Sequence, residues 1–205
     1  MRCPVVHHPA YVSPLPTGHR FPMPKYRLVR DRLLAEGTIT HWHLIEPHLA
    51  ADEDILLVHT AGYWLRCVRG ELTTAEVRRI GFPWSPALVR RSRAAVQGTI
   101  LAAKNALRDG VASNLAGGTH HAFPDHGEGY CVLNDIAIAT RVLQRDGLAR
   151  RIAVIDCDVH QGNGTAAIFA DDPDVFTFSI HGDKNFPLRK ERSKLDVALP
   201  DGVGD

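Results

Sequence analysis

The sequence has few of the features that mark secreted or membrane proteins. Its 205 residues include only four cysteines, Cys3, Cys67, Cys131 and Cys157, and no C-x-x-C pair. That usage favours unpaired thiols in a reducing compartment over a disulfide framework. No apolar run approaches the roughly 20 residues of a membrane span, and the N-terminus lacks the apolar core of a signal peptide. We therefore expect a cytoplasmic protein with no membrane partner.

A net charge of either sign is also missing. The sequence has 24 Lys and Arg residues against 23 Asp and Glu residues, so direct nucleic-acid binding is not expected. Short arginine runs such as Arg90, Arg91 and Arg93 are more simply explained as solvated helix faces. No repeat, low-complexity segment or long linker divides the chain. A single domain over residues 1–205 is predicted.

Helix and strand patterns alternate along the chain, which predicts an α/β fold with a parallel sheet. Thr73–Thr74 and Ser85-Pro86 are typical helix starts, and Asn134 or Asp135 can cap the helix after them. Residues 152–180 have the order strand, helix, strand expected of a βαβ unit. The predicted helices lie at about 23–36, 59–69, 74–76, 86–109, 135–146 and 165–170, and the predicted strands at 55–58, 152–159 and 175–180.

The most informative stretch is I-A-V-I-D-C-D-V-H-Q-G-N-G, residues 152–164. Its apolar start predicts a fully buried strand of a parallel sheet. Strand alternation then places three polar side chains on a common face, namely Asp156, Asp158 and His160. The opposite face, with Ile155, Cys157 and Val159, is expected to pack inside. Buried charges of this kind are costly unless they are paired or bind a metal.

Asp158 and His160 supply one oxygen and one nitrogen donor, followed by a Gly-rich turn. Catalytic zinc takes such ligands, usually three from the protein with one open position, so a third ligand is required. Asp156 lies deeper on the same face and is expected to orient a histidine. The alternative is an aspartate pair bonded to backbone at the end of a strand.

A second cluster, His120-His121, lies in a glycine-flanked loop. Imidazole titrates near neutral pH, so the pair suits general acid–base catalysis. The two histidines could instead be metal ligands, and the spacing alone does not decide between these roles.

Three motifs together resemble the zinc-dependent histone deacetylase family: G-G-T-H-H-A-F at 117–123, G-E-G-Y-C-V-L-N-D-I-A-I-A at 127–139 and V-I-D-C-D-V-H-Q-G-N-G-T at 154–165. Gln161 and Asn163 make the sequence most similar to the class IV and bacterial branch of that family. The resemblance implies the parallel-sheet arginase/deacetylase fold, a three-layer α/β/α arrangement, here lacking the later strands.

The resemblance also implies roles for individual residues. Asp158 and His160 would bind Zn²⁺, and His121 would be the general base and acid. His120, oriented by Asp156, would assist, and Asn163 would lie behind His121. Tyr130 and Phe186 would line the tunnel for the substrate's acylated side chain. A structural K⁺ would be held, largely through backbone carbonyls, by Asp156, Asp158, His160, Ser179 and Ile180.

The family's third zinc ligand and its oxyanion-stabilising tyrosine have no counterpart in this sequence. The first hypothesis is a zinc-dependent hydrolase that removes acetyl or other acyl groups from lysine side chains or acylated small amines. The alternative is a non-catalytic relative that acts as a binding module. Arginase-type chemistry with two manganese ions ranks last, because it needs more Asp and His ligands. The sequence does not indicate the oligomeric state.

Overall fold

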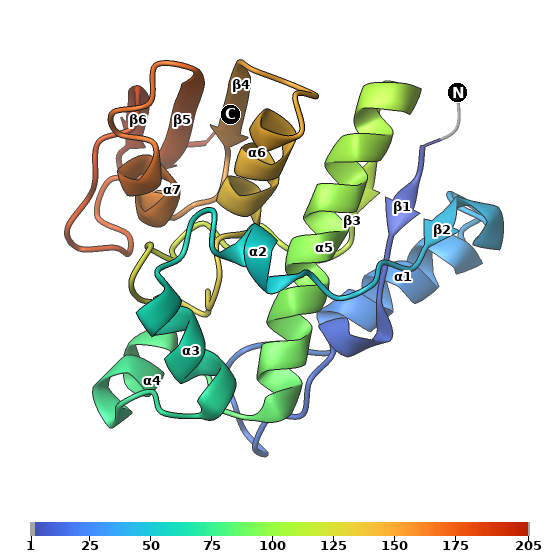
Figure 1. Cartoon of the computed structure of the whole chain (residues 1–205), viewed down its shortest axis with the longest axis horizontal. Coiled ribbons are helices and arrows are strands. Elements are labelled where there is room, and N and C mark those ends of the chain that lie inside the picture. Colours follow the sequence, from blue (N-terminus) through green and yellow to red (C-terminus); the bar gives the residue numbers. More distant parts are fainter. Residues whose placement is uncertain (1–2, 205) are drawn as a thin grey trace.

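The computed structural model describes residues 3–204 as parallel strands with helices packed around them (Figure 1). In chain order the elements are β1 (Val5–Val6), η1 (Pro9–Tyr11), α1 (Lys25–Ala35), η2 (His41–His43), β2 (Leu44–Ile45), α2 (Asp52–Ile55), α3 (Ala61–Arg69), α4 (Thr74–Ile80), α5 (Pro86–Asp109), β3 (Ser113–Asn114), α6 (Asp135–Arg145), β4 (Ile152–Asp156), α7 (Asn163–Ile168), β5 (Val175–Gly182) and β6 (Leu195–Leu199).

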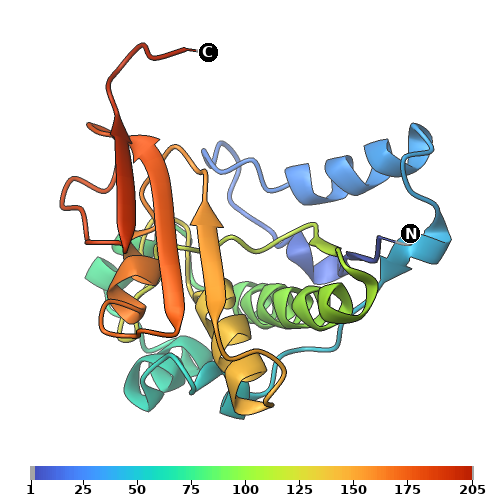
Figure 2. The same cartoon turned by 90° about the horizontal axis from the view of Figure 1, so that it is seen from above.

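The strands form two three-stranded sheets, with orders β2-β1-β3 and β4-β5-β6, and every pair within them is parallel. In Figure 1 the sheets lie apart, with α5 and α6 between them in that view. Figure 2 shows β4, β5 and β6 side by side with their arrows in the same direction. The α/β class with parallel strands is therefore confirmed, and the register places Asp156 of β4 beside Ser179 of β5.

The predicted helix starts are confirmed because the capping signals act locally. Thr73 caps α4 through a capping box with Glu76, and Ser85 caps α5 with Pro86 in its first turn. Asn134, not Asp135, is the N-cap of α6, and its side chain accepts from the Ala137 amide. No helix within residues 3–204 is long and apolar enough to cross a membrane.

Two strand predictions are wrong: no strand lies at residues 55–58, and the strand predicted over 152–159 ends at Asp156. Residues 55–58 do not form a strand: Ile55 is the last residue of α2, and turns follow it. A run of four apolar residues fits either structure, and the acidic residues 52–54 favour a helix start at this point. The two-residue strands β1, β2 and β3 and the later strand β6 were not assigned either, because so short a strand has almost no periodicity.

The strand β4 is not buried on both faces. Val154 packs against α6 and α7, in a cluster with Ala137 and Phe169. On the opposite face Ile155 is 60% exposed and Val159 54% exposed, and Cys157 is also exposed. The prediction assumed that helices cover both faces of the sheet, whereas the described helices cover only one face of β4.

The long helix α5 is the centre of the core. Its buried face includes Ala94, Ala95, Val96 and Ile100, which pack with large rings from distant segments. Gly98 lies where the helix passes closest to η1 and β3. A β-carbon there would be 2.1 Å from the Tyr11 hydroxyl oxygen and 2.8 Å from the Asn114 side chain.

We expect alanine to act oppositely at two helical glycines. At Gly98 the added methyl group has no room, so Gly98→Ala should lower the free energy of unfolding by about 1–3 kcal/mol. At Gly62, exposed on α3, the nearest atom would be 3.8 Å away. Gly62→Ala should therefore raise stability by about 0.5–1 kcal/mol. Urea denaturation of both variants measures the difference, and equal effects would contradict the packing described for α5.

Candidate active site

The His120-His121 pair is held on both sides by the first residues of α6. On one side the Asp135 carboxylate, fully buried, accepts from the amides of Gly118 (3.2 Å) and Thr119 (2.8 Å). On the other side the Asn134 amide group donates to the carbonyl oxygen of Ala122 at 3.2 Å. The same Asp135 carboxylate also accepts from the hydroxyls of Thr99 and Thr119. The loop is thus fixed through its backbone.

Each histidine of the pair has a partner at Nδ1. His120 Nδ1 lies 2.5 Å from the Asp156 carboxylate, and His121 Nδ1 lies 2.7 Å from the Asn163 side-chain oxygen. The Asn163 nitrogen donates toward Glu128 at 3.4 Å, which directs the oxygen to His121. With Nδ1–H donated, the Nε2 of each ring is left unprotonated in the neutral form.

Both rings are buried, at 6% and 4% exposure, with centroids 4.1 Å apart. Burial, followed by the charge of His120, lowers the pKa of His121 to about 4, while the hydrogen bond that His121 donates to the Asn163 oxygen works in the other direction. At neutral pH His121 is therefore uncharged and able to accept a proton.

Asp158 and His160 follow the end of β4 and are positioned by turns, not by strand alternation. The amide of Asp158 donates to Asp156 (2.9 Å), and the amide of His160 donates to Asp158 (2.8 Å). Burial acts to raise the pKa of Asp158, but the His160 amide and the imidazoles of His120 and His160 together hold that pKa below its usual value. Asp158 is consequently a carboxylate at neutral pH.

These two side chains fit zinc in kind but not in number. His160 Nδ1 lies 3.0 Å from an Asp158 oxygen, and both side chains are about half exposed. Oxygen and nitrogen donors of this type bind zinc, but a catalytic site usually takes three from the protein. Over residues 3–204, no group of three or more His, Cys, Asp or Glu side chains could hold a metal.

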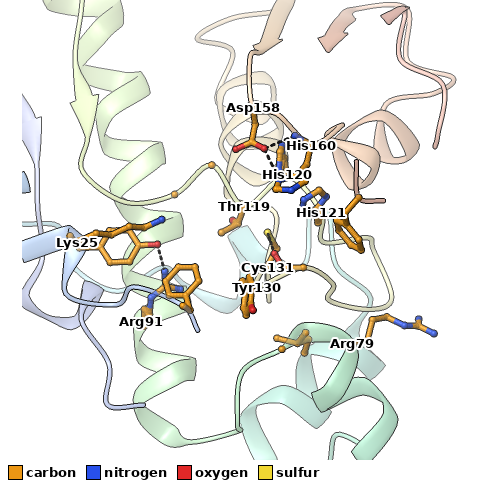
Figure 3. Close-up of a pocket in the computed structure, with 18 of the residues that line it drawn as sticks. Lys25, Arg79, Arg91, Thr119, His120, His121, Tyr130, Cys131, Asp158 and His160 are labelled. Atoms are coloured by element: carbon orange, nitrogen blue, oxygen red, sulfur yellow. Dashed lines mark hydrogen bonds and ion pairs between the residues drawn. The ribbon is translucent and has the colours of Figure 1, made fainter. Parts of the chain in front are cut away.

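The histidine pair, Asp158 and His160 open into one pocket of about 540 Å³ (Figure 3). Phe186 lines it, with its ring edge-on to His121 at 4.9 Å between centroids. Tyr130 lines it from another side and packs on Phe21 and Phe82. Gly129 passes so close to His121 and Phe186 that a β-carbon would be 2.7 and 2.9 Å from their rings. A side chain at position 129 would therefore clash with both rings.

The pocket also contains basic residues for which the sequence indicated no role in a site. Lys25, Arg78, Arg79 and Arg91 line it, and Asp158 is the one acidic residue among its lining residues. The prediction that Arg91 belongs to a solvated helix face is wrong, because Arg91 is buried. The sequence indicated Asp135 only as a possible helix cap, although a carboxylate in the first turn of a helix with a buried face is a signal for a larger role. The predicted potassium residues Ser179 and Ile180 lie on β5, next to β4.

With this geometry in view, comparisons with known proteins show which family has it. The family model of the histone deacetylase domain matches residues 19–205. The chain belongs to the histone deacetylase family. A crystal structure of a histone deacetylase homologue from Aquifex aeolicus superposes with a TM-score of 0.86 at 26% identity, covering 99% of this chain and 60% of that one. The arginase/deacetylase-like fold is thereby confirmed.

Two sequence relatives show how much of a longer protein this chain matches. An uncharacterized protein of Picosynechococcus is 54% identical over the whole chain and 68% of its own length. The acetoin utilization protein AcuC of Bacillus subtilis is 34% identical over 80% of this chain and 44% of its own. This histone deacetylase family member therefore spans about half to two thirds of the length of these relatives.

Removing the Asp135 carboxylate should loosen the loop before His120. Asp135→Ala leaves the Gly118 and Thr119 amides and the Thr99 hydroxyl without their acceptor, while the Thr119 hydroxyl still donates to the Leu133 carbonyl oxygen. We therefore expect stability to fall by about 2–4 kcal/mol. Hydrogen exchange of the Gly118 and Thr119 amides should accelerate more than exchange in α5. Asp171→Ala, at an exposed aspartate, is the matched control. Unchanged exchange at Gly118 and Thr119 would refute the anchoring role.

The low pKa of His121 can be measured by NMR in the metal-free chain. We expect a midpoint near 4, raised in Asn163→Asp, where a negative charge replaces the amide, and lowered further in Asn163→Leu. Gln144→Glu, on the far end of α6, makes the same charge change as a control. Because unfolded histidine titrates near 6.5, His121 should destabilise the fold progressively as the pH falls from about 6.5 to 4. A midpoint above 6 would contradict the burial argument.

Proposed function

We propose that this protein is a hydrolase that removes acetyl or other acyl groups from lysine side chains or acylated small amines. The observation that supports it best is the pair of buried histidines, each held at Nδ1 by a different acceptor. A buried, neutral imidazole with a free Nε2 beside metal-type ligands is suited to take a proton from water and return it to an amine.

In this proposal the residues divide the work between them. His121 accepts the proton of the attacking water and later gives it to the leaving amine. His120, hydrogen-bonded to Asp156, supports the charge that develops. Tyr130 and Phe186 hold the apolar stem of the acylated side chain and exclude water from it.

Zn²⁺ would be bound by Asp158, His160 and one further donor, and when bound it would polarise the amide carbonyl and acidify the water. The structural K⁺ beside Ser179 and Ile180, the single-domain organisation over 1–205 and the cytoplasmic location remain predictions. Family membership does not specify which molecule carries the acyl group.

A second candidate function is a binding module for acylated amines without catalysis. It is favoured by the shortfall of metal ligands among residues 3–204. Zinc binding discriminates between the two: near-stoichiometric, tight zinc by elemental analysis after dialysis argues against the binding module.

The hydrolase proposal is tested by amide cleavage. Purified chain with Zn²⁺ is incubated with an acetyl-lysine peptide and with an acetylated diamine, and free amine is measured. We expect release of free amine above the protein-free rate, and His121→Ala should lower that rate about 10²–10⁴-fold. His48→Ala, at an exposed histidine, is the control. Activity that survives His121→Ala would overturn the assignment of the base.

A further inference from the structure

Arg91, on α5, is a buried cation with no acidic partner. Its side chain is 3% exposed. Its Nε donates to the carbonyl oxygen of Tyr11 at 3.1 Å and its Nη2 to the Tyr26 hydroxyl at 2.7 Å. The remaining contacts are with the rings of Tyr26, Phe82 and Phe21, 5.0–5.9 Å from the guanidinium carbon. Every hydrogen-bond and ring partner of Arg91 within residues 3–204 is therefore neutral. The buried Asp135 carboxylate acts on the same Tyr11 and Tyr26 hydroxyls but forms no ion pair with Arg91, and a buried charge without a paired counter-ion is costly.

The guanidinium of Arg91 keeps donors available to the pocket. Of its five N–H groups, Nε and Nη2 have partners, whereas Nη1 has none among the described residues. Among the described residues, His59 Nδ1 is the one buried side-chain nitrogen or oxygen atom that has no hydrogen-bond partner. Nη1 is therefore not sealed, and Arg91 lines the same pocket as Asp158.

Lys25 places a second cation beside Arg91. Its ammonium lies 4.7 Å from the centroid of the Phe21 ring and 5.3 Å from that of Tyr26, and it forms no ion pair with residues 3–204. Figure 3 shows Lys25 and Arg91 together on one side of the pocket, across from Asp158 and the histidines, with Cys131 between. Burial and then Arg91 lower the pKa of Lys25, as expected of two neighbouring cations, while the Asp158 carboxylate acts in the opposite direction.

An anion would satisfy this arrangement. The pocket lining carries Lys25, Arg78, Arg79 and Arg91 against the single carboxylate of Asp158, and that carboxylate lies at the metal-type end. Arginine recognises a carboxylate in particular, because its planar N–H groups match the two oxygens. The rings of Phe21, Tyr26 and Phe82 enclose Arg91 and strengthen its attraction for an anion, whereas Lys25 is exposed to solvent.

We propose that Arg91 and Lys25 form a carboxylate-binding subsite, and that the acyl groups accepted by the pocket end in a carboxylate, as malonyl, succinyl and glutaryl groups do. The claim about acyl groups rests on the proposed hydrolase function; carboxylate binding does not. Hydrolysis of such an amide breaks the C–N bond and forms a C–O bond to water. The products are a dicarboxylate and the free amine, with no oxidation or reduction.

Binding of glutarate to the metal-free chain tests the subsite without requiring activity. Titration calorimetry should show glutarate binding more tightly than the neutral glutaramide. Arg91→Gln should weaken glutarate about tenfold or more, and Lys25→Gln several-fold. Arg90→Gln removes the same charge from the neighbouring exposed position of α5 and should leave the affinity unchanged. If Arg91→Gln fails to fold by circular dichroism, Lys25→Gln still decides.

A second comparison distinguishes the two carboxylates that the pocket could bind. Acetate represents the product carboxylate formed at the reacting end, and glutarate represents a distal one. Glutarate binding more tightly than acetate, and succinyl-lysine peptide binding more tightly than butyryl-lysine peptide, support the proposal. Equal affinities, or glutarate affinity that is unchanged in Arg91→Gln and Lys25→Gln, overturn it. If the unmodified chain binds glutarate but cleaves no amide, the hydrolase proposal is refuted and the carboxylate subsite is not.

Discussion

The first turn of α6 is the constraint on which the candidate site depends. Asn134 and Asp135 hold the backbone on the two sides of the histidine pair, one through Ala122 and the other through Gly118 and Thr119. A carboxylate at a helix N-terminus is stabilised by the helix dipole, and here it is also saturated with hydrogen-bond donors. The two histidines can therefore be buried in a glycine-rich loop without the loop being free to move.

Burial separates the acid–base residues from the metal-type ligands. His120 and His121 are sealed against Asp156 and Asn163, so their tautomers are determined by partners inside the protein. Asp158 and His160 are half exposed and bonded mainly to each other. The first pair is complete within residues 3–204, whereas the second has room for a further donor. The affinity for zinc therefore distinguishes the two candidate functions, because only a hydrolase requires the second pair to hold a metal.

Local signals predicted the helices well, and the errors came from an ambiguous local pattern at residues 55–58 and from non-local packing at Arg91. Thr73, Ser85 and Asn134 act on amides within three residues of themselves, so their sequence context suffices. The strand assigned to 55–58 failed because four apolar residues fit a helix end equally well. Arg91 was attributed to a solvated face, because nothing near it in sequence shows that Phe21, Tyr26 and Phe82 enclose it.

The sequence by itself determined the family, the helix boundaries within a few residues, and the short segments that carry His120, His121, Asp158 and His160. These features follow from motifs and from hydrogen bonds between near neighbours. Only the tertiary structure decided that Asp135 anchors the histidine loop, that β4 is covered on one face, and that Arg91 is a buried cation facing the pocket. Each of these features depends on contacts between segments far apart in the chain. Such contacts leave no periodic pattern or fixed residue spacing in the sequence.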